Sequence, residues 1–296
     1  MEQKRYYLQT NSKDAGLAFS TMICLYVFIS FLGQAIVGSI FERGTIEHTA
    51  ICALFPTIAI GVVILYYWLY KNFSPKQLTG IKKTNPLWII LSVVLLCAMF
   101  FGFGFINGIV QTLIELAGLK TPSSKISITT ISDVVVYTIT LAVFPAVFEE
   151  IFFRGLMLNA LSNAKKVCSI TLVSICFALY HGSITQFFYQ FLFGVGLCLL
   201  AITSKSVIAC ICAHFLNNFL IILLEFFNVN INLNSALIII MGLVFCGAFI
   251  FVTIKALSKQ ESVMTEKGHA KKFFLPFGVV GVLICALLIL SNLLVA

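Results

Sequence analysis

The sequence predicts an all-α protein that crosses a membrane about eight or nine times around a polar cavity. Hydrophobic residues make up 60% of the chain, charged residues only 10%, and the mean hydropathy is +1.05. The hydrophobic residues occur in long continuous runs and not in the alternation of half-buried strands. Helices suit a bilayer because they satisfy their own backbone hydrogen bonds. A soluble domain with a large buried core is the alternative, but it needs far less apolar surface.

The apolar runs are separated by short polar segments, which place the expected helices in order. A polar arm over residues 1–16 precedes the first run, which is long enough to span, so we expect no short cleavable leader. Within the third run, Gly104 and Gly108 have the G-x-x-x-G spacing that permits close helix packing. We expect spans at residues 17–41, 50–70, 87–116, 132–163, 167–181, 186–203, 207–227, 236–257 and 274–294. The hairpin between the fifth and sixth spans is a candidate re-entrant segment.

The basic residues indicate the orientation of these spans. Alternating the loops between the two sides places 15 of the 19 Lys and Arg residues on one side. The positive-inside rule makes that side cytoplasmic, with the N-terminus inside and the C-terminus outside. The net charge of +8 therefore fits a lipid-facing surface, and we expect membrane lipid and not nucleic acid as a partner. We expect an integral protein of a bacterial plasma membrane.

The chain divides into three parts by its motifs. Residues 1–130 hold the polar arm and three spans, residues 131–227 hold the charged motifs, and residues 228–296 hold two further spans. The ten cysteines lie within or beside apolar runs and form no C-x-x-C pair. They indicate packing residues, and neither a disulfide framework nor a thiolate zinc site.

Three charges lie inside the fourth apolar run, where unpaired charge is costly. Glu150 and Arg154 are four residues apart with the acid first, the better order for a helical ion pair. Glu149 points about 100° away around the helix, so it needs a different polar partner. Pro145 removes the helical donor for the Leu141 carbonyl and predicts a kink that admits water beside the carboxylates.

Polar residues on two later helices are the candidate partners of Glu149. His181 ends the fifth helix, and His214 and Asn218 share one face of the seventh because they are four residues apart. Their distances along the helices from the basic loops are similar enough for all of them to meet in one cavity open to the cytoplasm. The plainer interpretation is that each side chain only hydrogen-bonds a neighbouring helix.

A carboxylate and a histidine can activate water, and a second histidine and an amide can stabilise an oxyanion. This chemistry predicts peptide-bond hydrolysis without a covalent intermediate. The same groups suit a zinc ion, with Glu149, His181 and His214 as ligands, so both mechanisms stay open. The chain has no H-E-x-x-H motif and no G-x-S-x-G motif, which argues against the common helical zinc-protease and serine-hydrolase arrangements.

Three short motifs on successive helices carry a family resemblance over about residues 130–225. Glu149-Glu150-x-x-x-Arg154, Phe177-x-x-x-His181 and His214-x-x-x-Asn218 resemble, in this order, the motifs of the CPBP family. That family, also called Abi, contains the CAAX proteases and the bacteriocin-processing enzymes. The resemblance implies an all-helical intramembrane endopeptidase with this segment as its catalytic core.

The resemblance also implies roles for individual residues. Glu149 would be the base that activates water, with His181 sharing that water, and Glu150 and Arg154 would shape the site. His214 and Asn218 would form the oxyanion hole. The substrate would be a lipidated CAAX-like protein or another membrane peptide such as a bacteriocin precursor. The family is often labelled metalloprotease, although a metal-free glutamate mechanism is also argued for it.

Two other classes of function use the same polar cluster. A non-catalytic bacteriocin immunity or scaffold protein would keep the fold without needing Glu149 or His181. A proton-coupled transporter would use the cluster for proton transfer and is expected to show discontinuous helices in paired halves. The sequence shows no such repeat.

Overall fold

The computed structural model describes residues 11–71, 80–119, 128–229, 235–258, 270–275 and 277–295, and the all-α prediction is confirmed over these residues. Seven of the helices described are long and apolar enough to cross a membrane, so the chain is an integral membrane protein. The expected spans 167–181 and 274–294 correspond to two shorter apolar helices. The outer faces carry exposed side chains such as Phe31 and Leu116, as contact with lipid requires.

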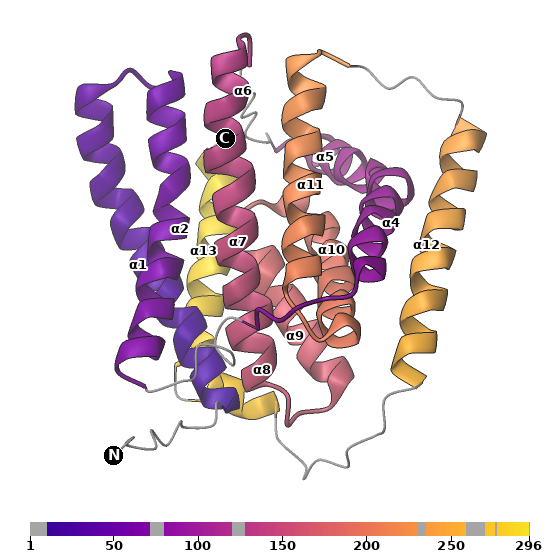
Figure 1. The fold of residues 1–296 in the computed structure, drawn as a ribbon. Coiled ribbons are helices and arrows are strands. Elements are labelled where there is room, and N and C mark those ends of the chain that lie inside the picture. The colour runs from indigo at the N-terminus through magenta and orange to yellow at the C-terminus, as the bar shows by residue number, and fades with distance from the viewer. Residues whose placement is uncertain are drawn as a thin grey trace.

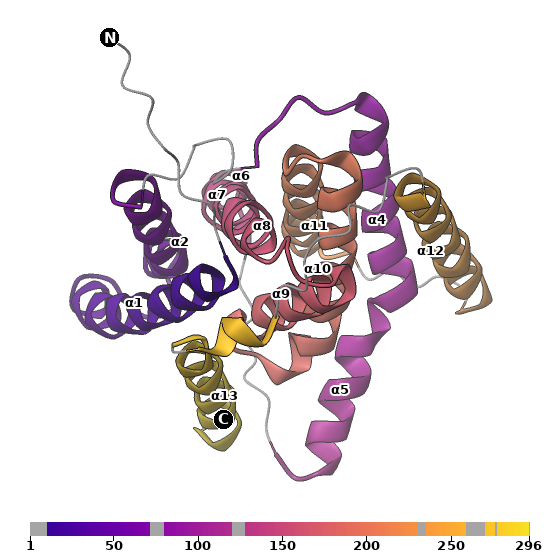
Figure 2. The same ribbon diagram turned by 90° about the horizontal axis from the view of Figure 1, so that it is seen from below.

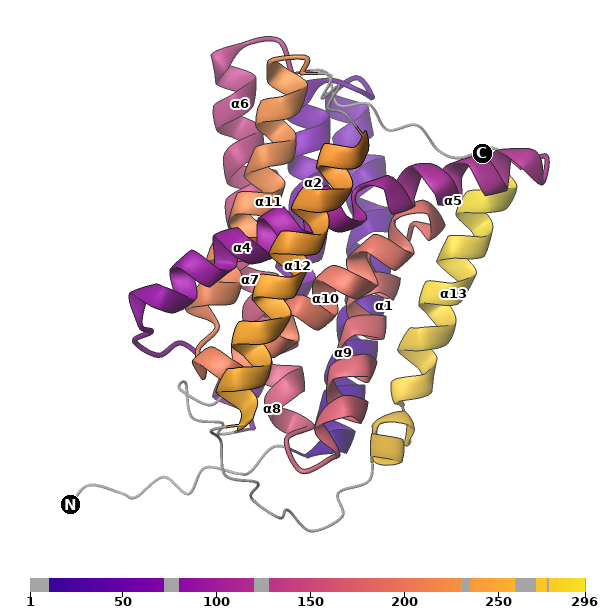
Figure 3. The ribbon, with the colours of Figure 1, turned by 90° about the vertical axis from the view of Figure 1, so that its right-hand side faces the viewer.

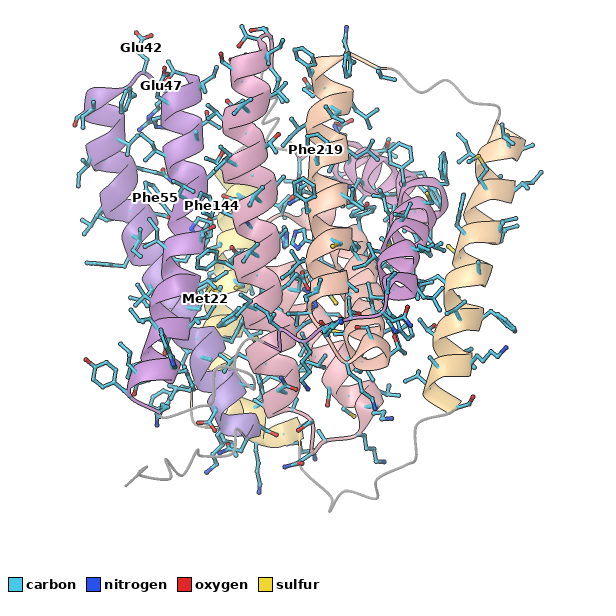
Figure 4. All side chains as sticks on the ribbon, viewed as in Figure 1. Met22, Glu42, Glu47, Phe55, Phe144 and Phe219 are labelled. Carbon is cyan, nitrogen blue, oxygen red and sulfur yellow. The ribbon has the colours of Figure 1, made fainter. Side chains whose placement is uncertain are left out.

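The first helices form an antiparallel pair at one side of the bundle (Figure 1). α1 (Ser12–Ile40) starts with a capping box made by Asn11 and Asp14. α2 (Ile46–Leu69) returns beside α1 after a short turn capped by Thr45. Figure 4 shows Glu42 and Glu47 at this turn, at the end of the bundle opposite the start of α1.

The third expected span is broken into α4 (Pro86–Phe103) and α5 (Phe105–Leu116) at Gly104. Figure 3 shows α4 crossing the bundle obliquely and α5 continuing almost horizontally, both at a large angle to neighbouring helices such as α11. α12 (Ser235–Ser258) packs on α4 through Gly102 and Gly242: a Cβ atom on Gly242 would lie 2.8 Å from the Cα of Gly102. The close packing predicted for Gly104 and Gly108 is therefore made by different glycines, and no described atom lies within 4 Å of a Cβ on Gly108.

A single long helix runs through the middle of the fold (Figure 1). It contains α6 (Ile131–Tyr137), the π-helical segment η1 (Thr138–Val143), α7 (Phe144–Glu150), a second π-helical segment η2 (Ile151–Met157) and α8 (Leu158–Ala160). We call it the central helix. Thr130 and Asp133 form a capping box at its start, which explains why the Asp133 carboxylate is buried there.

The remaining helices surround the central helix. α9 (Lys166–Tyr180) and α10 (Ile184–Ser204) form a hairpin, and α11 (Ile208–Phe226) runs beside the central helix. Figure 2, viewed along the bundle, shows α9 and α10 in the middle between α1 and α4. η3 (Ala270–Phe274) and α13 (Gly278–Val295) pack against α1. The turn of the hairpin lies below the upper ends of α6 and α11 in Figure 3.

Candidate active site

The central helix holds Glu149, Glu150 and Arg154 between two π-helical segments. Proline at position 145 has no N–H, and the turn before it widens so that the Phe144 N–H bonds to the Ile139 carbonyl, five residues earlier. The predicted disturbance at Pro145 is thus a π-helical segment within a continuous helix. Such segments re-aim side chains and occur often at functional sites.

Glu150 and Arg154 form the predicted ion pair. Arg154 Nη1 lies 2.8 Å from Glu150 Oε1, and both side chains are fully buried. Arg154 Nη2 also donates to the Gly194 carbonyl at 3.2 Å, and the guanidinium lies over the Phe177 ring at 4.4 Å from its centroid. A buried arginine is stable here because its charge, its planar face and two of its N–H groups all have partners.

His214 joins the two glutamates. Its Nδ1 lies 2.8 Å from Glu150 Oε1, and its Nε2 lies 4.0 Å from Glu149 Oε2. The sequence placed His214 beside Glu149, whereas the structure gives its short hydrogen bond to Glu150. This bond orients the imidazole, because the carboxylate accepts the proton of Nδ1 and Nε2 is then directed toward Glu149.

His181 caps the end of α9, and its ring orientation follows from one hydrogen bond. Nδ1 lies 2.7 Å from the carbonyl oxygen of Phe177. A carbonyl only accepts, so Nδ1 carries a proton, and in the neutral imidazole Nε2 is an acceptor. His181 therefore offers a proton-accepting nitrogen, as a group that shares a water with a carboxylate must.

Asn218 has an unexpected partner on the central helix. Its Nδ2 donates to the Leu141 carbonyl at 2.9 Å, the carbonyl that loses its ordinary helical donor to Pro145. Its Oδ1 accepts from Asn217 Nδ2 at 3.2 Å, and Asn217 in turn accepts from the Tyr189 hydroxyl at 2.9 Å. The amide is therefore held in place on both sides, while one N–H of Nδ2 stays available for another acceptor.

Sequence reasoning missed Tyr180. Its hydroxyl donates to Glu149 Oε1 at 3.3 Å, so a tyrosine one position before His181 helps to position the carboxylate. Only its place next to a motif histidine could have drawn attention to it. The other carboxylate oxygen, Glu149 Oε2, is buried and has no hydrogen-bond partner among the described residues. A buried carboxylate oxygen without a donor is costly unless water or a ligand approaches it.

A cavity of about 500 Å³ adjoins these side chains, and we call it the Glu149 cavity. Glu149, His181, His214 and Asn218 all line it, together with residues from α1, α2 and α10. The lining also includes Ile128 and Glu225, which lie where the central helix begins and α11 ends. The cavity thus extends away from the basic end of the bundle. On which side of the membrane this cavity opens stays a prediction.

The donor set does not favour the zinc site that the sequence left open. Glu149, His181 and His214 do not form a metal-binding group, and over the described ranges no three His, Cys, Asp or Glu side chains do. His214 Nε2 and Glu149 Oε2 are 4.0 Å apart, wider than two ligands on one tetrahedral zinc ion with bonds of about 2 Å.

A comparison with family models identifies part of the chain. Residues 131–220 match the model described as type II CAAX prenyl endopeptidase Rce1-like. Neither a curated protein nor a solved structure matches the chain at a significant level. The matched segment contains the central helix, the α9–α10 hairpin and the part of α11 with His214 and Asn218. Residues 131–220 of this membrane protein are therefore an Rce1-like domain of the type II CAAX prenyl endopeptidase family, within the CPBP group.

Proposed function

We propose that this protein is an intramembrane endopeptidase that hydrolyses a peptide bond of a membrane-associated or lipidated, CAAX-like peptide or protein. The observation that carries the proposal is the position of Glu149. Its side chain is buried, Oε2 has no hydrogen-bond partner among the residues described, and the residue lines a cavity shared with His181. A water molecule bound there would give the carboxylate its missing donor.

The reaction begins with this water. Glu149 takes a proton from it, His181 Nε2 accepts a hydrogen bond from it, and its oxygen attacks the carbonyl carbon of the substrate. Tyr180 holds Glu149 Oε1 through its hydroxyl during this step. When the tetrahedral intermediate collapses, the C–N bond breaks and the proton on Glu149 passes to the leaving nitrogen. No covalent intermediate with the enzyme is needed.

His214 and Asn218 stabilise the oxyanion of the intermediate. Two carboxylates and one guanidinium lie in this buried cluster, and the His214 imidazole packs against both carboxylates. Its Nδ1 bonds to Glu150, and Nε2, which faces Glu149 and the cavity, would donate to the oxyanion once it carries a proton. Asn218 supplies the N–H that the Leu141 carbonyl does not use.

The side from which the substrate enters follows from the basic residues. With the lysine-rich end in the cytoplasm, as the positive-inside rule indicates, the Glu149 cavity extends toward the opposite face of the membrane. An epitope inserted after Gly44 should then be accessible to antibody on intact cells, and one inserted after Ser162 only after permeabilisation. The reverse result would place the mouth of the cavity on the cytoplasmic side.

One cleavage assay tests the proposed reaction. The purified protein in liposomes is incubated with a farnesylated CAAX peptide and with its unlipidated counterpart, each with and without 1,10-phenanthroline. We expect cleavage of the lipidated peptide at an unchanged rate in the presence of the chelator. Failure to cleave either peptide would count against the endopeptidase, and activity that disappears with chelator and returns with zinc would contradict the glutamate mechanism.

A further inference from the structure

A second cavity, of about 310 Å³, lies among the basic residues at the other end of the bundle. We call it the lysine pocket. Lys82, Lys166 and Lys205 line it from three different segments, and Ser162, Ser169 and Ser206 add hydroxyl groups. No Asp or Glu is among the described residues that line it. Three exposed lysines therefore border one cavity, and no described carboxylate in its lining offsets their charge, which favours an anion there.

Helix ends add further positive potential to the lysine pocket. α9, of 15 residues, begins at Lys166, and no side chain caps its first turn. α11, of 19 residues, begins at Ile208, directly after two lining residues, Ser206 and Val207. A helix N-terminus carries about half a positive charge and favours anions, so a lysine at this position is electrostatically unfavourable on its own. Two such ends at one pocket form a suitable site for a phosphate group.

Arg154 gives an independent indication of a ligand. It lines the lysine pocket although its side chain is only 2% exposed, and its Nε is buried without a hydrogen-bond partner among the residues described. Glu150 and the Gly194 carbonyl use its terminal nitrogens. Because Nε itself is buried, an ordered water held by a phosphate in the pocket would supply the missing acceptor.

The walls of the lysine pocket are held by tertiary hydrogen bonds, so the pocket is a built site. Ser206 Oγ donates to the Lys82 carbonyl at 2.6 Å, and the Val207 N–H bonds to the Gly80 carbonyl at 3.2 Å. Lys205 has a left-handed backbone with φ of 56°, an uncommon conformation for a residue with a side chain. These features fix the positions from which the lysine side chains start.

We propose that the lysine pocket binds the phosphate of an anionic phospholipid headgroup. Phosphate fits the combination of three lysines, the Ser162 hydroxyl and two helix N-termini. The pocket also lies at the basic end of the bundle, where anionic headgroups of the cytoplasmic leaflet meet basic residues between helices. Inorganic phosphate offers the same chemistry and is the second source that the experiment separates.

The test compares two triple variants of the full chain. In the first, Lys82, Lys166 and Lys205 are replaced by Gln, and in the control Lys255, Lys271 and Lys272 are replaced, which removes the same charge outside the pocket. Binding of short-chain phosphatidylglycerol and phosphatidylcholine is measured by native mass spectrometry in detergent. The shift of the melting temperature by millimolar inorganic phosphate is measured in parallel.

We expect phosphatidylglycerol to bind more tightly than phosphatidylcholine, and the first variant to lose about a hundredfold in affinity, at roughly one kcal/mol per lysine. The control variant should lose less than threefold. Stabilisation of the unsubstituted protein by phosphate alone, lost only in the first variant, would also support the pocket and point to free phosphate. Equal losses in both variants, or no preference for the anionic lipid and no effect of phosphate, would overturn the proposal. These readouts do not depend on protease activity.

Discussion

The buried pair of Glu150 and Arg154 gives the sharpest prediction about stability. Replacing Arg154 by Met keeps most of the volume of the side chain but removes its charge, its bonds to Glu150 and Gly194, and its contact with the Phe177 ring. Glu150 then remains buried with His214 as its one described polar partner. Breaking a buried pair in this way costs about 3–5 kcal/mol, because it leaves an uncompensated charge.

The matching double variant separates this charge penalty from lost packing. In Glu150→Gln/Arg154→Met neither charge remains, so we expect the double variant to be more stable than Arg154→Met by about 2 kcal/mol or more. Arg154→Lys keeps the charge but loses the planar contact with Phe177 and should lie between the unsubstituted protein and Arg154→Met.

The assay is reversible unfolding in mixed micelles, followed by circular dichroism as the mole fraction of a denaturing detergent increases. The unfolding equilibrium constant of Arg154→Met should rise by about a hundredfold or more. The single variant Glu150→Gln is measured as well. The reasoning is refuted if Arg154→Met costs less than about 1 kcal/mol, or if the costs of Glu150→Gln and Arg154→Met simply add in the double variant.

Three further predictions concern His181, Asn218 and the glycine contact between α4 and α12. His181→Gln should lower kcat/KM by about a hundredfold or more. Its stability should change little, since among the described residues the imidazole hydrogen-bonds to the Phe177 carbonyl in the same helix. Retained activity would remove His181 from the mechanism. Asn218→Ala should cost about 1 kcal/mol of stability. The cost should be smaller in a Pro145→Ala background, where the backbone N–H of residue 145 can again donate to the Leu141 carbonyl. Equal costs in both backgrounds would contradict this role of the Asn218 amide. Gly242→Ala should destabilise the protein by about 1–3 kcal/mol, because the new Cβ would meet the backbone of Gly102. Gly247→Ala is the control and should not destabilise it, because the space around Gly247 is open. Similar melting temperatures for the two variants would argue against the contact between Gly242 and Gly102.

The sequence was enough to predict a helical membrane protein and the ion pair between Glu150 and Arg154. Long apolar runs separated by basic loops are enough to indicate a helical membrane protein, because a bilayer permits few other structures. The ion pair of Glu150 and Arg154 could be predicted because a spacing of four residues alone places two side chains side by side on a helix. The domain boundaries at residues 130 and 227 stay predictions.

The other contacts of the site depend on tertiary packing, which the spacing of residues along one helix does not encode. The bond from His214 to Glu150 joins residues 64 positions apart, and the Tyr180 hydroxyl meets Glu149 across 31 positions. A second example is Gly102, which contacts Gly242 on a helix far along the chain, so a local G-x-x-x-G spacing indicated the wrong pair. The direction of the Glu149 cavity likewise follows from where the α9–α10 hairpin turns, and not from the depth of single residues.

The central claim is that Glu149 is the base that activates water, and one matched pair of variants tests it most directly. Glu149→Gln removes the base, while Glu225→Gln removes the exposed carboxylate at the other end of the same cavity. Cleavage of the farnesylated peptide is measured in liposomes for both variants, together with their melting temperatures. We predict that Glu149→Gln lowers the rate by at least a thousandfold while remaining folded, and that Glu225→Gln changes it by less than threefold. Full activity of a folded Glu149→Gln variant would contradict the account.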